Sequence, residues 1–111
     1  MTNENQQSYI NPEEIWWVFI YLTPKFLTKE GHIISTILEY GGMIKNKKDL
    51  QNKLKKNNIN ITYQTLHTLF KNLLLKEILV KEIIDKQSFF VINKKYIEEA
   101  KQYKERIFTQ I

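Results

Sequence analysis

Residues 60–79 read NITYQTLHTLFKNLLLKEIL, and this stretch decides the fold class of the chain. Apolar residues recur in it at intervals of three and four, which is the spacing of one face of an α-helix. Thr62 can cap the first turn. The inward face is expected to consist of Leu66, Leu69, Phe70, Leu73 and Leu74. The opposite face is polar and contains no acidic residue, so the sequence predicts a helix over residues 62–76 whose outer side suits an anionic surface.

Two further helices are predicted before this stretch. Thr28 can cap a helix that ends at residues 41–42, a Gly-Gly pair, because glycine readily takes the left-handed conformation found after helices. Asn46 then opens a short helix in which Leu50 and Leu54 point inward. These two helices and the helix over residues 62–76 form a group of three.

Charge is distributed unevenly along the chain. Residues 43–56 contain six lysines and one aspartate, whereas residues 1–24 contain three acidic residues and no basic residue. The net charge of +5 is therefore concentrated near the short helix that Asn46 opens. Such a concentration indicates a positive field that attracts a polyanion, although a solubilising surface has the same composition.

The pattern changes after residue 76. Residues 78–84 and 88–92 are rich in β-branched and aromatic side chains, and a polar segment separates them. This arrangement is typical of a β-hairpin, here with a three-residue turn over residues 85–87. The sequence therefore predicts a two-stranded wing over residues 78–92.

Each end of the chain adds a helix to this arrangement. Asn11 and Pro12 are strong signals for the start of a helix over residues 11–23, and Asn93 caps a long helix over residues 93–111. Residues 1–10 are polar and lack periodicity, so we expect a flexible tail there. The expected fold is mainly α with a small β-hairpin, in a single domain over residues 11–111.

Three helices followed by a two-stranded wing resemble the winged helix-turn-helix of prokaryotic transcription regulators. The resemblance extends from about Thr28 to Ile92 and is strongest to the small dimeric archaeal Lrs14-like group and to the PadR and MarR types. Thr62 and Thr65 match the first and fourth positions of the recognition helix in that pattern. Glu77 departs from it, because a glycine is usual at this position, so the helix is expected to end differently.

The resemblance implies that the helix over residues 62–76 enters the major groove of double-stranded DNA, where residues near the N-terminus of such helices reach base edges. Lysines of the preceding helix are expected to contact the phosphate backbone, and Lys86 at the tip of the wing an adjacent minor groove. The residues expected to contact DNA are Lys47, Lys48, Lys53, Thr62, Tyr63, Gln64, His67, Thr68, Lys71 and Lys86. A polar face of an ordinary surface helix is the alternative interpretation.

The terminal helices carry more apolar surface than a winged helix of this size needs. We expect them to form a homodimer interface, since an exposed aromatic patch is unusual on a monomer. The residues expected there are Trp16, Phe19, Ile20, Tyr96, Ala100, Tyr103 and Ile107. The alternative is that the two helices pack on their own domain.

Several classes of function are not expected. The chain has no cysteine, only two histidines, and three glycines that form no phosphate-binding loop, so we expect no enzyme activity, no metal site and no cofactor. The first residues do not resemble a secretory signal, and the longest apolar run is far shorter than the ~20 residues that span a bilayer. A cytoplasmic protein with no membrane partner is expected.

The sequence therefore predicts a dimeric DNA-binding transcriptional regulator from an archaeon, a virus or a plasmid. Two alternatives remain open. One is a plasmid or viral replication or partition protein that binds DNA with the same fold. The other is a winged helix that binds proteins, with the lysines only solvating its surface.

Overall fold

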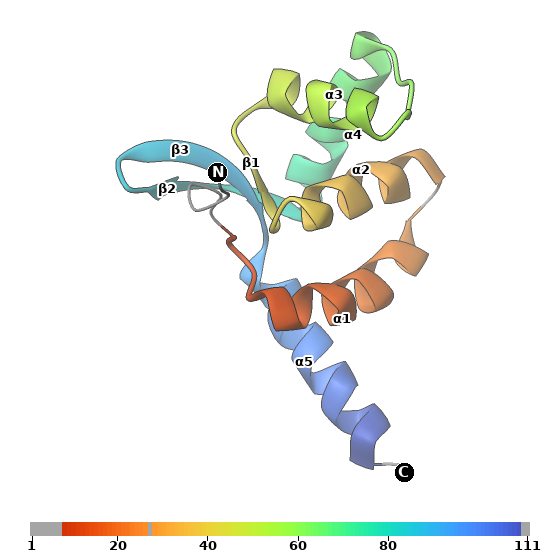
Figure 1. Ribbon diagram of the computed structural model, residues 1–111, viewed down its shortest axis with the longest axis vertical. Coiled ribbons are helices and arrows are strands. Elements are labelled where there is room, and N and C mark those ends of the chain that lie inside the picture. Colours follow the sequence, from red (N-terminus) through yellow and green to blue (C-terminus); the bar gives the residue numbers. More distant parts are fainter. Residues whose placement is uncertain (1–7, 27, 110–111) are drawn as a thin grey trace.

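The computed structural model describes residues 8–26 and 28–109, and the predicted order of helices and hairpin is confirmed (Figure 1). The 3₁₀ turn after the first helix and a third, two-residue strand before the third helix were not predicted. Residues 110–111 of the predicted last helix lie outside the described ranges. The elements are α1 (Pro12–Leu22), a 3₁₀ turn η1 (Thr23–Lys25), α2 (Thr28–Glu39), β1 (Met43–Ile44), α3 (Lys47–Lys56), α4 (Tyr63–Leu75), β2 (Leu79–Ile84), β3 (Gln87–Ile92) and α5 (Lys94–Thr109).

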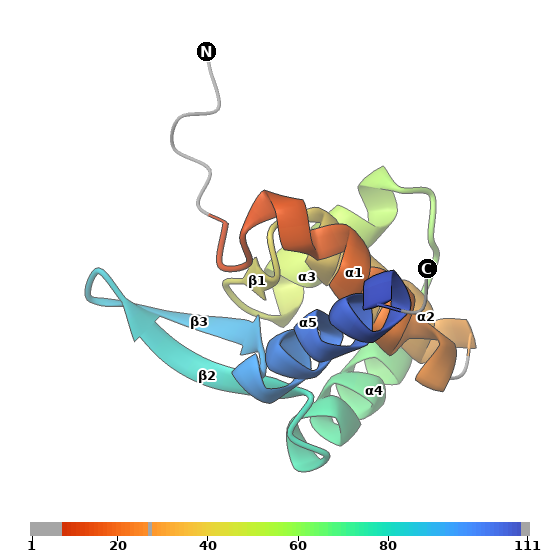
Figure 2. The same cartoon turned by 90° about the horizontal axis from the view of Figure 1, so that it is seen from below.

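The strands form one antiparallel sheet in the order β1-β3-β2. The short strand β1 pairs Met43 with Val91 and Ile44 with Phe90, so the segment before α3 is joined to the wing. The long hairpin of β2 and β3 extends well beyond the helices (Figure 2). Helices α2, α3 and α4 with this hairpin make up a winged-helix arrangement, and α1 and α5 are the additional terminal helices.

The predicted three-residue turn over residues 85–87 is wrong, because the wing turns through two residues. Gln87 already pairs with Ile84 in the ladder, which leaves Asp85 and Lys86 as the turn. Their φ angles of 51° and 69° are both in the left-handed region. Two such residues in succession match the twist of a tight hairpin, but the usual signal is Asn, Asp or Gly followed by Gly, and Lys86 stands where that glycine is expected. An Asp-Lys turn therefore gives little warning in the sequence.

Side-chain caps position the starts of four helices as the sequence predicts. Asn11 accepts a hydrogen bond from the Glu13 backbone N–H at 3.2 Å, and Asn46 one from the Asp49 N–H at 2.8 Å. Thr62 accepts from the Thr65 N–H at 3.2 Å, and Asn93 from the Lys95 N–H at 3.0 Å. Each bond satisfies a backbone donor that has no partner inside the helix. The side chain of Thr28, which was expected to cap α2, lies outside the described part of the structure.

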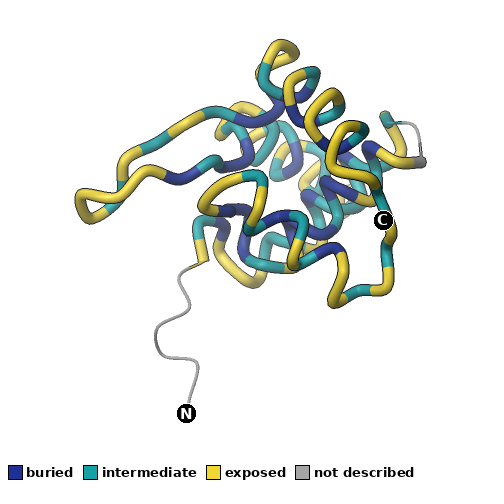
Figure 3. The backbone as a smooth tube through the Cα atoms, turned by 90° about the horizontal axis from the view of Figure 1, so that it is seen from above, coloured by how far each residue is buried: buried dark blue, intermediate teal, exposed yellow. Residues whose placement is uncertain are grey.

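The core is formed where the apolar faces of α2, α3 and α4 meet the inner face of the sheet. It includes Leu50 and Leu54 of α3 and Leu66 and Leu73 of α4, all at most 1% exposed. Figure 3 shows the buried residues gathered where these elements meet and the exposed ones along the end of the wing. The inward residues predicted for α3, and Leu66, Phe70 and Leu73 of α4, are thus confirmed as core, while Leu69 and Leu74 are half-buried.

The segment before α1 is attached to the domain as far as it is described. The expected tail over residues 1–10 lies mostly outside the described ranges, but Ile10 is 1% exposed and belongs to the core. The backbone N–H groups of Tyr9 and Ile10 donate to the Gly41 carbonyl at 2.8 and 2.9 Å. A side chain at Gly42 would collide with Ile10, since a Cβ there would lie 2.6 Å from its Cδ1. The Gly-Gly pair therefore ends α2 and also makes room for this segment.

Tyr9 links the same segment to the wing. Its hydroxyl donates to a carboxylate oxygen of Glu82 on β2 at 2.8 Å. Its ring packs on a small apolar cluster of the sheet that contains Met43, Phe89 and Val91. Burial, together with the bond to Glu82, raises the pKa of the Tyr9 hydroxyl, so it stays a donor at physiological pH. The segment before α1 thus stabilises the wing through contacts with both of its strands.

The end of α4 follows the pattern that glycine usually serves, although Glu77 stands in its place. Glu77 has a φ of 61°, its N–H donates to the Leu74 carbonyl at 3.0 Å, and the Ile78 N–H donates to the Leu73 carbonyl at 2.9 Å. These two bonds are those of a Schellman motif. The Asn93 side-chain amide also donates to the Glu77 carbonyl at 2.8 Å. The expectation of a different helix ending is therefore wrong, because these contacts hold Glu77 in the left-handed conformation.

We expect Glu77→Gly to raise the free energy of unfolding by about 0.5–1 kcal/mol, because a left-handed residue with a Cβ is strained by ~1–2 kcal/mol and part of the gain is offset by the flexibility of glycine in the unfolded chain. Urea unfolding of both proteins measures the difference. Asn58, with a φ of 60°, is the matched control, since asparagine tolerates this conformation and Asn58→Gly should change stability little. Equal effects of the two substitutions would contradict the assignment of strain to Glu77.

Candidate nucleic-acid interface

Helix α4 presents a polar face to solvent. Gln64, His67, Thr68 and Lys71 are exposed, and Tyr63 is 49% exposed. The buried stripe of the helix holds this face outward. In that stripe the Phe70 and Phe90 rings, on α4 and β3, form a T-shaped pair with centroids 4.9 Å apart. The structure thus brings together the residues predicted on α4, and Thr62 lies at the start of the same helix as its cap.

Lys47, the first residue of α3, reaches across to this polar face. Its ammonium donates to Nδ1 of His67 at 2.6 Å and lies 5.9 Å from the centre of the Tyr63 ring. Tyr63 and His67 are one turn apart on α4, so the lysine lies against both. Lys47 was predicted from the sequence to contact the phosphate backbone of DNA. Its pairing with His67 had no signal in the sequence, because the two residues belong to different helices.

Two contacts hold the side chain of Lys53, one with a residue of α3 and one with a residue that follows α2. Its ammonium lies 2.6 Å from Oδ1 of Asp49 and 4.8 Å from the centre of the Tyr40 ring. The side chains of Lys53 and Asp49 are only 20% and 24% exposed. Lys48, in contrast, is exposed and has no ion pair among the described residues. The predicted lysines of this helix therefore differ in how freely they can meet a ligand.

Asp49 organises the first turn of α3. Its carboxylate accepts from the Lys45 backbone N–H at 2.9 Å and from the Lys53 ammonium. Partial burial alone would raise the pKa of Asp49, but these hydrogen bonds and the nearby positive charges outweigh burial and hold the pKa below its usual range. The carboxylate is thus charged at physiological pH and joins the segment before α3 to the body of the helix.

The wing carries two exposed side chains that were not predicted from the sequence as part of the site. Lys81 and Ile83 of β2 lie opposite Phe90 and Ser88 of β3, respectively. Residues paired directly across an antiparallel ladder lie on the same face of the sheet, and Phe90 marks the face that meets α4. Lys81 and Ile83 therefore continue that face outward, and Ile83 is 74% exposed. Lys86 is exposed at the tip, as predicted. Successive side chains of a strand point to opposite faces of the sheet, and this rule, applied from Leu79 onward, was the signal available for these positions.

Helices α1 and α5 pack against each other within the chain. The Tyr21 hydroxyl donates to Glu99 at 2.7 Å, and the Trp17 and Phe108 rings form a T-shaped pair with centroids 5.6 Å apart. Ala100 is 1% exposed, which makes it a core residue of its own chain rather than part of a surface offered to a partner. Trp16 is different, because it is 60% exposed and stacks on Phe19.

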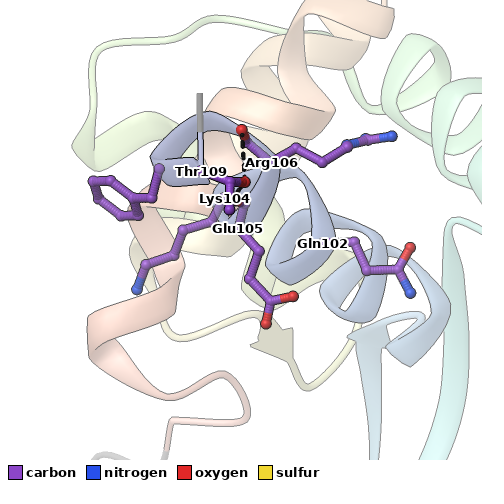
Figure 4. A pocket seen from close by; sticks show the side chains of 6 residues that line it. Gln102, Lys104, Glu105, Arg106 and Thr109 are labelled. Carbon is purple, nitrogen blue, oxygen red and sulfur yellow. Dashed lines mark hydrogen bonds between the residues drawn. The ribbon is translucent and has the colours of Figure 1, made fainter. Parts of the chain in front are cut away.

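The described residues contain no cluster of side chains suited to a metal ion, and no described helix is long and apolar enough to cross a membrane. A hollow at the end of α5 is lined by side chains of that helix alone, among them Gln102, Lys104 and Arg106. Figure 4 shows these side chains spreading in different directions, so they do not converge on a common point. This hollow therefore has the character of an open surface.

Comparison with solved structures supports the fold. The chain is similar to F93 from STIV, a winged-helix DNA-binding protein, with a TM-score of 0.52 and 23% sequence identity over 74% of this chain and 90% of that chain. No protein-family model matches the chain, and neither does any curated protein. The winged-helix fold is thereby confirmed, and the resemblance to the Lrs14-like, PadR and MarR groups stays a prediction.

We expect Asp49→Asn to lower the free energy of unfolding by about 1 kcal/mol near neutral pH, because it weakens hydrogen bonds to a charged acceptor. The lowered pKa determines how this loss depends on pH. The contribution of the carboxylate is present above the pKa of the unfolded chain, ~3.9, and disappears as the pH falls through the lower pKa of the folded protein. The difference between the two proteins should therefore shrink in acid.

Urea unfolding at a series of pH values checks this expectation. Glu105→Gln is the control, since Glu105 is exposed and its carboxylate has no ion pair among the described residues. A variant at Asp49 that is as stable as the original protein at neutral pH would contradict the role given to this carboxylate.

Proposed function

We propose that this chain is a sequence-specific double-stranded DNA-binding protein that regulates transcription, with α4 as the helix that enters the major groove. The observation that carries the proposal is the exposed polar face of α4, which contains no acidic side chain and is held outward by a buried stripe. An α-helix fits the major groove, and residues near its N-terminus reach the base edges. That F93 from STIV is a DNA-binding protein of the same fold is in line with this proposal.

Residues of the first two turns of α4 are the candidates for reading bases. The amide of Gln64 can donate to and accept from adenine at the same time, and the Thr68 methyl or the Tyr63 ring can contact a thymine methyl group. All three side chains are exposed. His67 lies on the same face of α4.

Lysines around α4 are the candidates for phosphate contacts. Lys48 on α3, Lys71 on α4 and Lys86 at the tip of the wing are all exposed. In the sequence, Lys48 precedes the candidate base-reading residues and the other two lysines follow them. Their contribution is expected to be independent of sequence and to weaken steeply with salt. Lys53 is assigned instead to holding α3, since Asp49 already neutralises it.

Gln64→Ala and Lys48→Ala should have different effects on binding. The first is expected to reduce discrimination between selected and random duplexes by roughly 1–3 kcal/mol, because it removes a base contact. The second should weaken binding to all duplexes alike and reduce the dependence on salt, because it removes one phosphate contact. Binding titrations at several salt concentrations measure both quantities.

Duplexes selected from a random pool supply the specific sequence for this comparison. A loss of affinity that is equal for every sequence in Gln64→Ala would contradict its role in base reading. Weak binding by the original protein that does not respond to salt would contradict the DNA-binding proposal itself. It would favour the alternative of a protein-interaction module.

We further propose that the chain is a homodimer whose interface is formed by α1 and the end of α5. Trp16 is 60% exposed and Phe108 is 56% exposed, so both large aromatic surfaces are available to a partner. Ile20, one helical turn after Trp16, and Ile107, next to Phe108 in the sequence, are half-buried. In Figure 1, α1 and α5 lie on one side of α2, and α3 and α4 lie on the other. A dimer of this kind leaves α4 free, and its two-fold symmetry suits a palindromic site.

Trp16→Ser is expected to weaken dimerisation by at least about tenfold, because exposed tryptophans at the centre of interfaces contribute strongly to binding. Sedimentation over a range of protein concentrations measures the dissociation constant. Tyr63→Ser is the matched control, since Tyr63 is a similarly exposed aromatic residue on α4 and should not affect the association. A monomer at micromolar concentration of the original protein would contradict the dimer.

A further inference from the structure

The hydrogen bond between Lys47 and His67 determines where the imidazole of His67 carries its proton. The ammonium of Lys47 lies 2.6 Å from Nδ1 of His67. A lysine ammonium has three donors and no acceptor, so it donates, and Nδ1 must accept. A neutral imidazole has one accepting and one donating nitrogen. The proton of neutral His67 therefore sits on Nε2.

Nε2 is the ring nitrogen available to a ligand. His67 is exposed on the polar face of α4, and no described residue forms a hydrogen bond with its Nε2. Its neighbours one turn away on either side are Tyr63 and Lys71, which belong to the same exposed face. The free N–H is thus one of the donors that α4 presents to solvent.

The position of Lys47 is fixed by the start of α3. Asn46 caps this helix through the Asp49 backbone N–H at 2.8 Å, and Lys47 is the first residue after the cap. Its ammonium also lies 5.9 Å from the centre of the Tyr63 ring. The lysine is therefore held between two residues of α4 instead of extending freely into solvent.

Building on the proposed DNA-binding function, we propose that Lys47 fixes His67 as a hydrogen-bond donor and that this donor recognises guanine in the major groove. Guanine presents two acceptors there, N7 and O6, and no donor. Cytosine presents an amino donor, adenine one acceptor beside an amino donor, and thymine a single acceptor, O4, beside its methyl group. The positive charge of Lys47 next to the ring also favours the base edge that consists of acceptors. Lys47 is a positioning residue in this arrangement, and His67 makes the contact.

The proton position can be measured in the free protein, without DNA. Long-range ¹H–¹⁵N correlation spectra at about pH 8 distinguish a protonated from an unprotonated ring nitrogen. We expect His67 to show a protonated Nε2 and an unprotonated Nδ1. His32 is an internal reference, because it is exposed and its ring makes no hydrogen bond among the described residues.

Substitution of the lysine tests its role in fixing the proton. Lys47→Met keeps most of the aliphatic side chain and removes the ammonium, so the ¹⁵N shifts of His67 should move towards those of His32. Lys48→Met is the matched control from the next position of α3 and should leave His67 unchanged. A protonated Nδ1 in the original protein, or no response to Lys47→Met, would overturn the inference.

Binding to duplexes selected from a random pool tests the contact with guanine. We expect a guanine preference at one position of the selected site, and a loss of roughly three- to tenfold in that preference in His67→Ala, as for one hydrogen bond. Replacing this guanine by 7-deazaguanine should reduce the affinity of the original protein but not of His67→Ala. Lys47→Met should reduce the preference only when His67 is present.

The possible results separate this inference from the proposed function. If the protein binds DNA specifically but His67→Ala leaves every base preference unchanged, the guanine contact is refuted and the DNA-binding function stands. If Lys47→Met weakens all duplexes alike and leaves the His67 spectrum unchanged, Lys47 is a phosphate contact and the pairing is refuted. If no duplex is bound, the proposed function fails and the guanine contact fails with it, while the proton position is still decided by the spectrum.

Discussion

The packing of α4 onto the wing orients the two elements that are proposed to approach DNA. Leu66, Phe70 and Leu73 face the core, and the Phe70 ring forms a T-shaped pair with that of Phe90 on β3. Because side chains three and four positions apart share one face of a helix, burying this stripe also determines which residues of α4 remain in water. The same aromatic contact determines which face of the wing lies towards α4. One buried face therefore aligns the two elements that are proposed to approach DNA.

The lysines of α3 and its approach look interchangeable in the sequence but have different environments. Lys53 is neutralised by Asp49, Lys47 is joined to His67, and Lys48 is exposed. A concentration of positive charge thus indicates the sign of the local field without saying which side chain is available. Those assignments depend on distances of a few ångströms between side chains, and a count of charges contains no information about such distances.

Local propensity is overruled at several turns. Glu77, Asp85 and Lys86 have positive φ angles, although none of them is a residue that prefers the left-handed region as glycine does. At Glu77 the hydrogen bonds of the helix end and the amide of Asn93 impose the conformation. At the wing tip, the ladder between Ile84 and Gln87 leaves room for only two turn residues. These were the points where prediction from sequence failed, because the contacts that compensate the strain come from elsewhere in the chain.

Hydrophobic periodicity and helix caps were sufficient to predict the order of the five helices and the hairpin, the buried stripe of α4 and the exposed face opposite it. They succeeded because both signals act between residues only a few positions apart. The partners of Lys47, Lys53 and Tyr9, and the burial of Ala100 between its own elements, depended on how helices and strands pack. Those contacts join residues far apart along the chain or on separate helices, and no local pattern encodes their distance. The tertiary structure alone decided which polar side chains form contacts between separate elements of the protein.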